Sequence, residues 1–504
     1  MRAPFPLGSH LKDIDTQIAS GAAWMVAFKL IDRGLGLVST VVLARLLVPA
    51  DFGLVAMATV IIAALQLLIA FSFDVPLIQN PNAGRDQFDT AWTINLLFSL
   101  GAAAILGALG YPAAEFYHEP RLAHVIHILA LAFAVQGLSN IGPVAFRREM
   151  RFDREFTFLL AKRVALLAGT IPLAFWLRNY WALVAGQLLG TVLGVLLSYR
   201  ASTYRPRLSL AAKTELFHAS KWLMLNNLSQ FLNGRAAEFI IGRVLGAKPL
   251  GIYTIGFEIS TLPTTELVAP INRAAFPGYA RVAGDLAQLR SSFLNVIGMI
   301  ALISLPAALG IFAVADLMVR AVLGEQWMAS VPIMQVLALF GAIQALQTNI
   351  AYIYLATGRL YLISVIGGLQ FLLLLACMVP GLLWWGVQGA AWAYLATAIV
   401  MIPVNQILLA RCLQLSATDF VRRLLRPLLA ALLMLAVVLG FKHVAPAPVS
   451  SHDYVVMLLA CIALGAGSFC GALWLLWRGA GRPAGPEQVV FGKLLSLLGR
   501  LRRR

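Results

Sequence analysis

Apolar runs of about 20 residues alternate with short polar connectors along almost the whole chain. The runs lie at residues 22–44, 53–73, 90–110, 122–142, 159–177, 182–199, 222–242, 251–271, 292–318, 331–355, 361–380, 388–410, 427–441 and 453–477. An α-helix needs about 20 apolar residues to cross the hydrocarbon core of a bilayer. The runs are continuous, whereas the strands of a membrane barrel alternate between apolar and polar residues. The pattern therefore predicts an all-α polytopic membrane protein with about 14 transmembrane helices.

The composition agrees with this fold class and argues against an enzyme. Of the 504 residues 60% are hydrophobic and 12% are charged, and the mean hydropathy is +0.82. Soluble chains are nearer to about 45–50% apolar and 25% charged residues. The short connectors leave no room for a catalytic loop domain, and no P-loop for ATP is present. The four cysteines show no CxxC spacing, so we expect no metal site, and we expect no cofactor.

Basic residues are distributed unequally between the two sides of the predicted bundle. With the N-terminus inside, the inside segments hold 27 of the 39 Lys and Arg residues and the outside loops hold 7. Cytoplasmic loops of membrane proteins are enriched in Lys and Arg. We therefore expect both termini in the cytoplasm. The same rule accounts for the net charge of +17 without nucleic acid. The basic tail at 479–504 would meet anionic membrane lipids through an amphipathic helix at 489–501.

A weak internal repeat appears when the sequence is shifted by 198 residues. The shift aligns Trp24 with Trp222, Arg45 with Arg243, Leu47 with Leu245 and Gly53 with Gly251. Six predicted spans separate the copies, so both copies have the same orientation, as in the parallel repeats of some transporters. We therefore expect an N-lobe at 1–200 (spans 1–6), a C-lobe at 201–412 (spans 7–12), two further spans at 413–478 and the tail at 479–504.

Five segments in order along the chain are typical of one transporter family. They are DRGLGLVSTVVLARLLVPADFGLVAMA at 32–58, FRREMRF at 146–152, FPGYARVAGDLAQLR at 276–290, LGEQW at 323–327 and ATGR at 356–359. Their order and spacing resemble those of Wzx-type polysaccharide exporters, also described as lipid-linked oligosaccharide flippases, of the MOP flippase superfamily. More distantly, Arg33-x2-Gly36 and Ala44-Arg45 resemble the lipid II flippases. Ser39 stands where those proteins tend to have a second basic residue.

The resemblance implies a flippase with a MOP- or MATE-like fold of two six-helix lobes. It implies alternating-access movement of undecaprenyl-diphosphate-linked oligosaccharide from the cytoplasmic to the periplasmic leaflet of the bacterial inner membrane. The product would be a surface polysaccharide: O-antigen (lipopolysaccharide), capsule or exopolysaccharide. The partners implied are the lipid-linked substrate, membrane lipids, a polysaccharide polymerase, and H⁺ or Na⁺ as the coupling ion.

The first predicted span carries three charges within one helical turn. Lys29, Asp32 and Arg33 have i, i+3 and i+4 spacing and lie deep in the run. Each such charge costs about 2.5–3.5 kcal/mol on insertion scales, so we do not expect them to face lipid. Lys29 and Arg33 are candidates for binding the diphosphate, and Asp32 is a candidate for ion coupling. The structural alternative is an internally paired cluster that joins helices.

The seventh predicted span has a comparable polar face. Asn227 and Gln230 are candidates for binding sugar hydroxyls, Arg235 for the diphosphate and Glu238 for ion coupling. The structural alternatives are a polar seam between lobes and a local Arg235–Glu238 pair. In the eighth span, Glu258 is a further ion-coupling candidate, because burial favours the protonated form of a carboxyl group.

Two other functions remain open from the residues alone. A multidrug exporter of the same superfamily would share the fold and differ in the chemistry of its cavity. A membrane scaffold would have no need of charges in mid-span. Before Glu258 is counted, the sign of the predicted intramembrane charge favours an anionic substrate, since Lys29, Arg33 and Arg235 outnumber Asp32 and Glu238.

Overall fold

The computed structural model describes residues 7–69, 77, 84–211, 234–483 and 485–488, and the regular elements among them are all helical. By their contacts the residues divide into two compact units, Met1–Gly251 and Ile252–Arg504. Each unit is described separately below. The expected amphipathic helix at 489–501 and most of the seventh predicted run lie outside the described residues.

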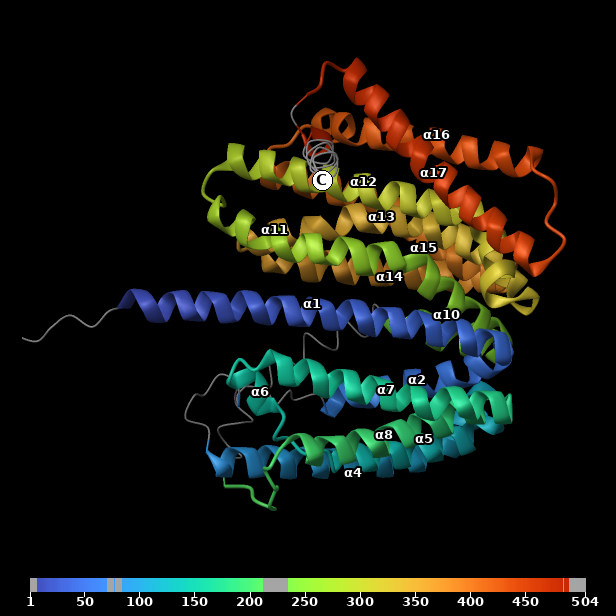
Figure 1. Cartoon of the computed structure of the whole chain (residues 1–504). Coiled ribbons are helices and arrows are strands. Elements are labelled where there is room, and N and C mark those ends of the chain that lie inside the picture. The colour runs from blue at the N-terminus through green and yellow to red at the C-terminus, as the bar shows by residue number, and fades with distance from the viewer. Residues whose placement is uncertain (1–6, 70–76, 78–83, 212–233, 484, 489–504) are drawn as a thin grey trace, which may run out of the picture. The chain divides into compact units, whose positions relative to one another are not determined.

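The first unit contains the helices that correspond to the first six predicted runs (Figure 1). They are α1 (Leu7–Leu46), α2 (Pro49–Ile69), α4 (Arg85–Tyr117), α5 (Arg121–Gly137), α7 (Phe152–Leu177) and α8 (Trp181–Ala201), with a short α6 (Val144–Arg148) between α5 and α7. Helices α4 and α5 pack together, as do α7 and α8, while α1 lies along α7 and α5 lies against α8. A further helical segment, 234–245, precedes α10.

The second unit contains the helices of the later runs. They are α10 (Ala247–Leu262, whose first turn belongs to the first unit), the π-helix η1 (Pro263–Val268), α11 (Ala269–Arg281), α12 (Leu286–Met318), the π-helix η2 (Val319–Leu323), the 3-10 helix η3 (Glu325–Ser330), α13 (Val331–Ala356), α14 (Leu360–Trp385), α15 (Val387–Leu413), α16 (Ala417–Val444) and α17 (Ser451–Gly479). Helix α12 packs against α13, α16 and α17, and α14 packs against α15.

Polar residues at the helix ends explain where several of these helices begin. The side chain of Asp285 accepts hydrogen bonds from the backbone N–H groups of Ala287 and Gln288 at the start of α12. Ser450 and Asp453 form a capping box at the start of α17. Such caps satisfy N–H groups that have no partner within the helix.

Nine helices in the described part of the chain are long and apolar enough to cross a membrane. They are α4, α7, α8, α12 with η2, η3 with α13, α14, α15, α16 and α17. Helices α2 and α5 are apolar over shorter stretches. The prediction of an all-helical polytopic membrane protein is confirmed. The predicted eighth run, 251–271, is not one regular helix, because the π-helical residues Pro263–Val268 interrupt it.

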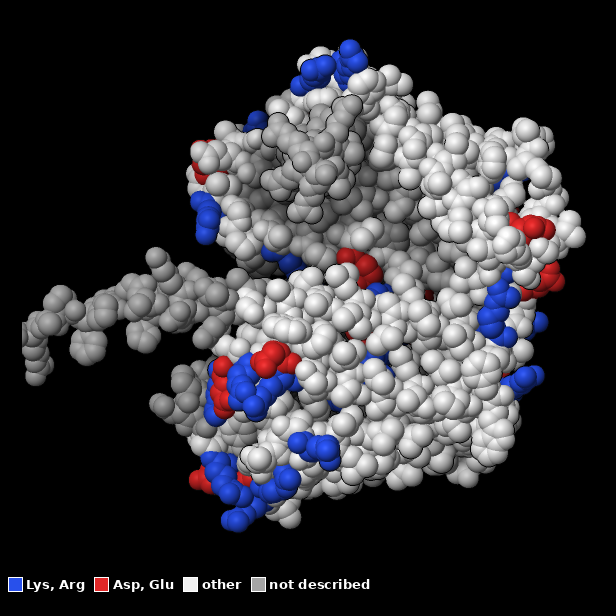
Figure 2. Space-filling model, viewed as in Figure 1, with Lys and Arg blue, Asp and Glu red and all other residues white. Residues whose placement is uncertain are grey.

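The burial of side chains is that of a protein surrounded by lipid. Helix α14 has one-sixth of its most apolar stretch buried (17%). Its last turn exposes Leu383, Trp384 and Trp385, each by more than 60%. In Figure 2 most of the face shown is uncharged, and the charged side chains gather in a few places. Aromatic residues are enriched where transmembrane helices meet the membrane–water interface, which is where we place this end of α14.

Two glycines allow the first turns of α2 and α10 to approach closely. A Cβ on Gly53 would overlap the carbonyl oxygen of Ala247, and a Cβ on Gly251 would overlap the carbonyl oxygen of Pro49. The shift of 198 residues that relates Gly53 to Gly251 also relates Pro49 to Ala247. Each glycine therefore contacts the carbonyl group four residues before the other glycine, and the repeat relates the two contacts to each other.

Candidate functional site

An ion pair joins the charged turn of α1 to α7. The Nε atom of Arg163 lies 3.0 Å from a carboxylate oxygen of Asp32. Lys29, one turn earlier, is exposed, and Arg33 is half-buried. The structure thus brings one of the three predicted residues, Asp32, together with a cation that our sequence reasoning did not single out. Arg163 was detectable as a basic residue inside the fifth predicted run, because charges in such runs are rare and commonly functional.

The ion pair is part of a regular α1–α7 contact. Trp24 and Phe28 of α1 pack their rings against Phe156 of α7, with ring centroids 5.0 and 6.4 Å apart. Further along α1, the guanidinium of Arg163 lies close to Gly36, where a Cβ would be 2.7 Å from it. Positions 24, 28, 32 and 36 lie four residues apart and share one face of a helix. The face that carries Asp32 therefore packs on α7.

A cavity of about 470 Å³ lies beside this contact, among α1, α7 and the end of α8. Its walls include Trp24, Phe156 and Phe158, with the cations Arg154 and Arg200 and the anion Asp153. Neither Lys29 nor Arg33 is among the described residues that line it. A cavity with aromatic walls and a small excess of cations suits a ligand that is partly apolar and partly anionic.

The described part of the seventh predicted run contains a local ion pair. Arg235 donates to both carboxylate oxygens of Glu238 at 2.8 Å, with the Glu238 side chain 12% exposed and that of Arg235 46% exposed. This is the local pairing that was one structural alternative for these two residues. Asn227 and Gln230 lie outside the described residues. Glu258 is half-buried on α10, in the second unit.

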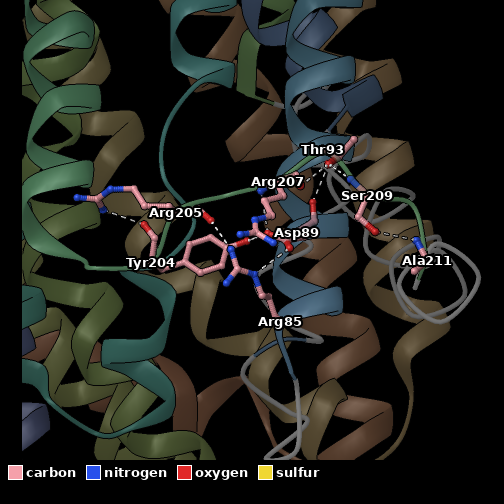
Figure 3. A network of polar contacts seen from close by, with 8 residues as sticks. All are labelled: Arg85, Asp89, Thr93, Tyr204, Arg205, Arg207, Ser209 and Ala211. Atoms are coloured by element: carbon pink, nitrogen blue, oxygen red, sulfur yellow. Dashed lines mark hydrogen bonds and ion pairs between the residues drawn. The ribbon is translucent and has the colours of Figure 1, made fainter.

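A buried carboxylate that the sequence analysis did not select holds the segment after α8 (Figure 3). Asp89 of α4 is 4% exposed and accepts hydrogen bonds from the Tyr204 hydroxyl and, at 2.9 Å, from the Arg207 backbone N–H. Thr93, one turn on, accepts a hydrogen bond from the Ser209 backbone N–H at 3.0 Å. Burial first, and then the hydrogen bond to Asp89, raise the pKa of Tyr204, so its hydroxyl remains a donor. This network positions residues 202–211 on α4.

The comparisons with known proteins agree with this architecture. A sequence-family model described as "Polysaccharide biosynthesis protein" matches residues 42–332, which is more than half of the chain. The chain belongs to this Wzx-like family of the MOP superfamily. The family consists of membrane transport proteins for polysaccharide biosynthesis, and not of enzymes.

Several relatives align over most of their length. The lipopolysaccharide biosynthesis protein WzxC of Escherichia coli (strain K12) is 28% identical over 68% of this chain and 70% of its own. The teichuronic acid biosynthesis protein TuaB of Bacillus subtilis (strain 168) is 27% identical over 85% of this chain and 90% of its own. The succinoglycan biosynthesis transport protein ExoT of Rhizobium meliloti (strain 1021) is 22% identical, over 84% and 86%.

Solved structures of two transporter types share the fold. The lipid II flippase MurJ, in an inward closed conformation, superposes with a TM-score of 0.72 over 90% of this chain and 99% of its own, at 13% identity. An inward-facing multidrug resistance MATE transporter gives a TM-score of 0.61 over 76% and 96%, also at 13% identity. The protein is therefore a bacterial multi-pass membrane transporter with a MurJ- and MATE-like fold, from a family that serves surface polysaccharide biosynthesis.

Proposed function

We propose that the protein is an alternating-access flippase for undecaprenyl-diphosphate-linked oligosaccharide. It moves this substrate from the cytoplasmic to the periplasmic leaflet of the inner membrane, for O-antigen, capsule or exopolysaccharide synthesis, and both of its termini are cytoplasmic. The observation that carries the proposal is the charged turn of α1, which the Asp32–Arg163 pair joins to α7, in a chain whose relatives are named for polysaccharide biosynthesis.

The charge at this contact favours an anionic substrate. Lys29 and Arg33 lie within one helical turn of Asp32 on α1, and Asp32 pairs with Arg163 of α7. A diphosphate headgroup is a suitable ligand for these cations, because guanidinium groups bind phosphate oxygens in a two-pronged geometry. A cationic drug would instead gain from acidic walls. In this proposal Lys29, Arg33 and Arg235 bind the diphosphate, and Asn227 and Gln230 bind sugar hydroxyls.

The cavity among α1, α7 and α8 is a suitable place for the headgroup to enter. It lies where the expected topology puts the cytoplasmic ends of these helices, and it combines aromatic walls with Arg154 and Arg200. Binding there would bring the headgroup to the turn of α1 before Lys29.

The ion pairs suggest how an ion gradient drives transport. Binding of the coupling ion at Asp32 would weaken its pairing with Arg163 and release the guanidinium toward the diphosphate. Binding of the ion at Glu238 would release Arg235 in the same way. In this proposal Asp32, Glu238 and Glu258 couple transport to H⁺ or Na⁺, and the product passes to a polysaccharide polymerase.

Deleting the gene tests the substrate class. Cells without it should accumulate undecaprenyl-diphosphate-linked oligosaccharide on the cytoplasmic face and lose the corresponding surface glycan. The wild-type gene and an Arg45→Gln variant, altered near the far end of α1, should both restore the glycan. Arg33→Ala should not restore it, even at normal membrane abundance, and Arg33→Lys should restore it in part because the charge is kept. An intact glycan combined with sensitivity to cationic dyes would replace this proposal with drug export.

A further inference from the structure

A second cavity, of about 720 Å³, lies in the second unit and is rich in arginine. It is formed by the first turns of α12, the first turns of α16 and the segment 485–488 that follows α17. Its cations are Arg290 of α12 and Arg422, Arg423 and Arg426 of α16. We call this the arginine pocket. It contains none of the residues proposed above for substrate binding or ion coupling.

Among the described residues, the arginine pocket has more positive than negative charge. Arg290 donates to the backbone carbonyl of Leu413 at 3.0 and 3.3 Å, and Arg423 donates to that of Leu294 at 3.1 Å. The Leu413 carbonyl carries no charge, so it orients Arg290 and leaves its charge in place, whereas Arg423 also interacts electrostatically with the Glu487 carboxylate.

The carboxylates near the pocket are fewer than its cations. Arg426 pairs with the buried Glu487 at 3.1 Å, and Asp419 lies in the wall. Among the described residues, none pairs with the exposed Arg422. Four cations thus face two carboxylates, and the pocket is a site for an anion.

The surroundings indicate that this anion is attached to a lipid. Both α12 and α16 are long and apolar enough to span a membrane, and the pocket lies at the beginning of each. From there an exposed apolar stripe runs along α16 through Val421 (57% exposed), Leu425, Leu429 and Leu432. Residues at this spacing share one face of a helix. A ligand could therefore place phosphate oxygens among the arginines and acyl chains along the stripe.

We propose that the arginine pocket binds the phosphate group of an anionic phospholipid from the surrounding bilayer. Basic pockets between transmembrane helices on the cytoplasmic side are suited to such headgroups, and each Arg near the surface contributes about 1 kcal/mol, or about fivefold in affinity. The lipid would tie α12, α16 and the segment after α17 together at the membrane surface. This proposal does not depend on which substrate the protein transports.

The test measures binding of fluorescent phosphatidylglycerol to the purified full-length protein in a neutral detergent. Arg422→Gln should weaken binding about fivefold, and Arg422→Glu should weaken it further. Arg422 is exposed and has no partner among the described residues, so these variants should unfold at the wild-type temperature. The matched control is Arg411→Gln, which removes an exposed arginine at the end of α15, outside the pocket. Its affinity should equal that of the wild type.

Competitors identify the source of the phosphate. Unlabelled phosphatidylglycerol should displace the probe, whereas phosphatidylcholine and millimolar inorganic phosphate should not. If the Arg422 and Arg411 variants bound phosphatidylglycerol equally well, the lipid would not bind in the arginine pocket. Displacement by inorganic phosphate would show a free-anion site, and displacement by undecaprenyl diphosphate at lower concentration than by phosphatidylglycerol would show a substrate site. Either result would overturn the assignment to a bilayer phospholipid.

Discussion

At the scale of single residues, the ion pair between Asp32 and Arg163 gives both charges a partner within the helical bundle. We predict that Arg163→Ala lowers the thermal stability and membrane abundance of the protein, because Asp32 would then lose its cation. Interhelical polar contacts in membrane proteins contribute about 0.6 kcal/mol on average and up to about 1.7 kcal/mol. The measurement is the melting temperature of the detergent-solubilised protein, followed by size-exclusion chromatography.

A double-mutant cycle separates the interaction energy of the Asp32–Arg163 pair from the effect of changing each side chain alone. Asp32→Asn with Arg163→Gln should destabilise the protein by less than the sum of the two single changes, because each single change strands a charge. Changes that simply add would show that the two side chains do not interact.

The charged turn of α1 could be located from the sequence, but its partner could not. Lys29, Asp32 and Arg33 stand out because charges are rare in an apolar run, and the local Arg235–Glu238 pair follows from i, i+3 spacing. The Asp32–Arg163 pair joins residues far apart in the chain, so it depends on how α1 packs on α7. Asp89 was missed for the same reason, because its partners lie in the segment after α8.

At the scale of helices, the close approach of α2 and α10 depends on the absence of a side chain at Gly53. We predict that Gly53→Ala destabilises the protein by about 1–3 kcal/mol or more, since the added Cβ meets a backbone carbonyl that cannot rotate away. The unfolding temperature of the purified protein measures the effect. Gly251→Ala should behave similarly because its contact with Pro49 is the reciprocal one.

The control for these variants is Gly101→Ala, in the middle of α4. A Cβ at Gly101 has nothing within 4 Å. Alanine favours a helix over glycine by about 0.5–1 kcal/mol, so this variant should be as stable as the wild type or slightly more stable. If Gly53→Ala were equally harmless, the two helices would not cross at this glycine.

The sequence predicted that the helices exist better than it predicted where they end or become irregular. Each described helix longer than 20 residues overlaps a predicted apolar run. Long apolar runs predict helices because a backbone surrounded by lipid must form its hydrogen bonds within the segment. The π-helix at Pro263–Val268 leaves no such signature, since it lies within an apolar run and hydropathy does not distinguish a π-helix from an α-helix.

At the scale of the whole molecule, the hydropathy pattern and five ordered segments were sufficient for the fold class and the family. Burial inside each unit was not predictable in the same way, because lipid-facing and core-facing side chains are equally apolar. Helices α12 and α14 read alike in sequence, yet 61% of the most apolar stretch of α12 is buried and 17% of that of α14. The partners of each helix, and not its composition, decide this difference.

The orientation of the molecule in the membrane is the last prediction, and it follows from the unequal distribution of Lys and Arg. Both termini should be cytoplasmic, which places the α16–α17 loop in the periplasm and the segment after α8 in the cytoplasm. A cysteine in place of Val449, which is 91% exposed, should react with an impermeant thiol reagent in intact cells with a permeable outer membrane. A cysteine in place of Leu208, which is 73% exposed, should react only after the inner membrane is opened.

The background protein should lack its four native cysteines, which include the exposed Cys470. The reverse pattern of labelling would invert the orientation. It would then place the arginine pocket at the periplasmic surface and reverse the direction in which the α1–α7 cavity receives its ligand.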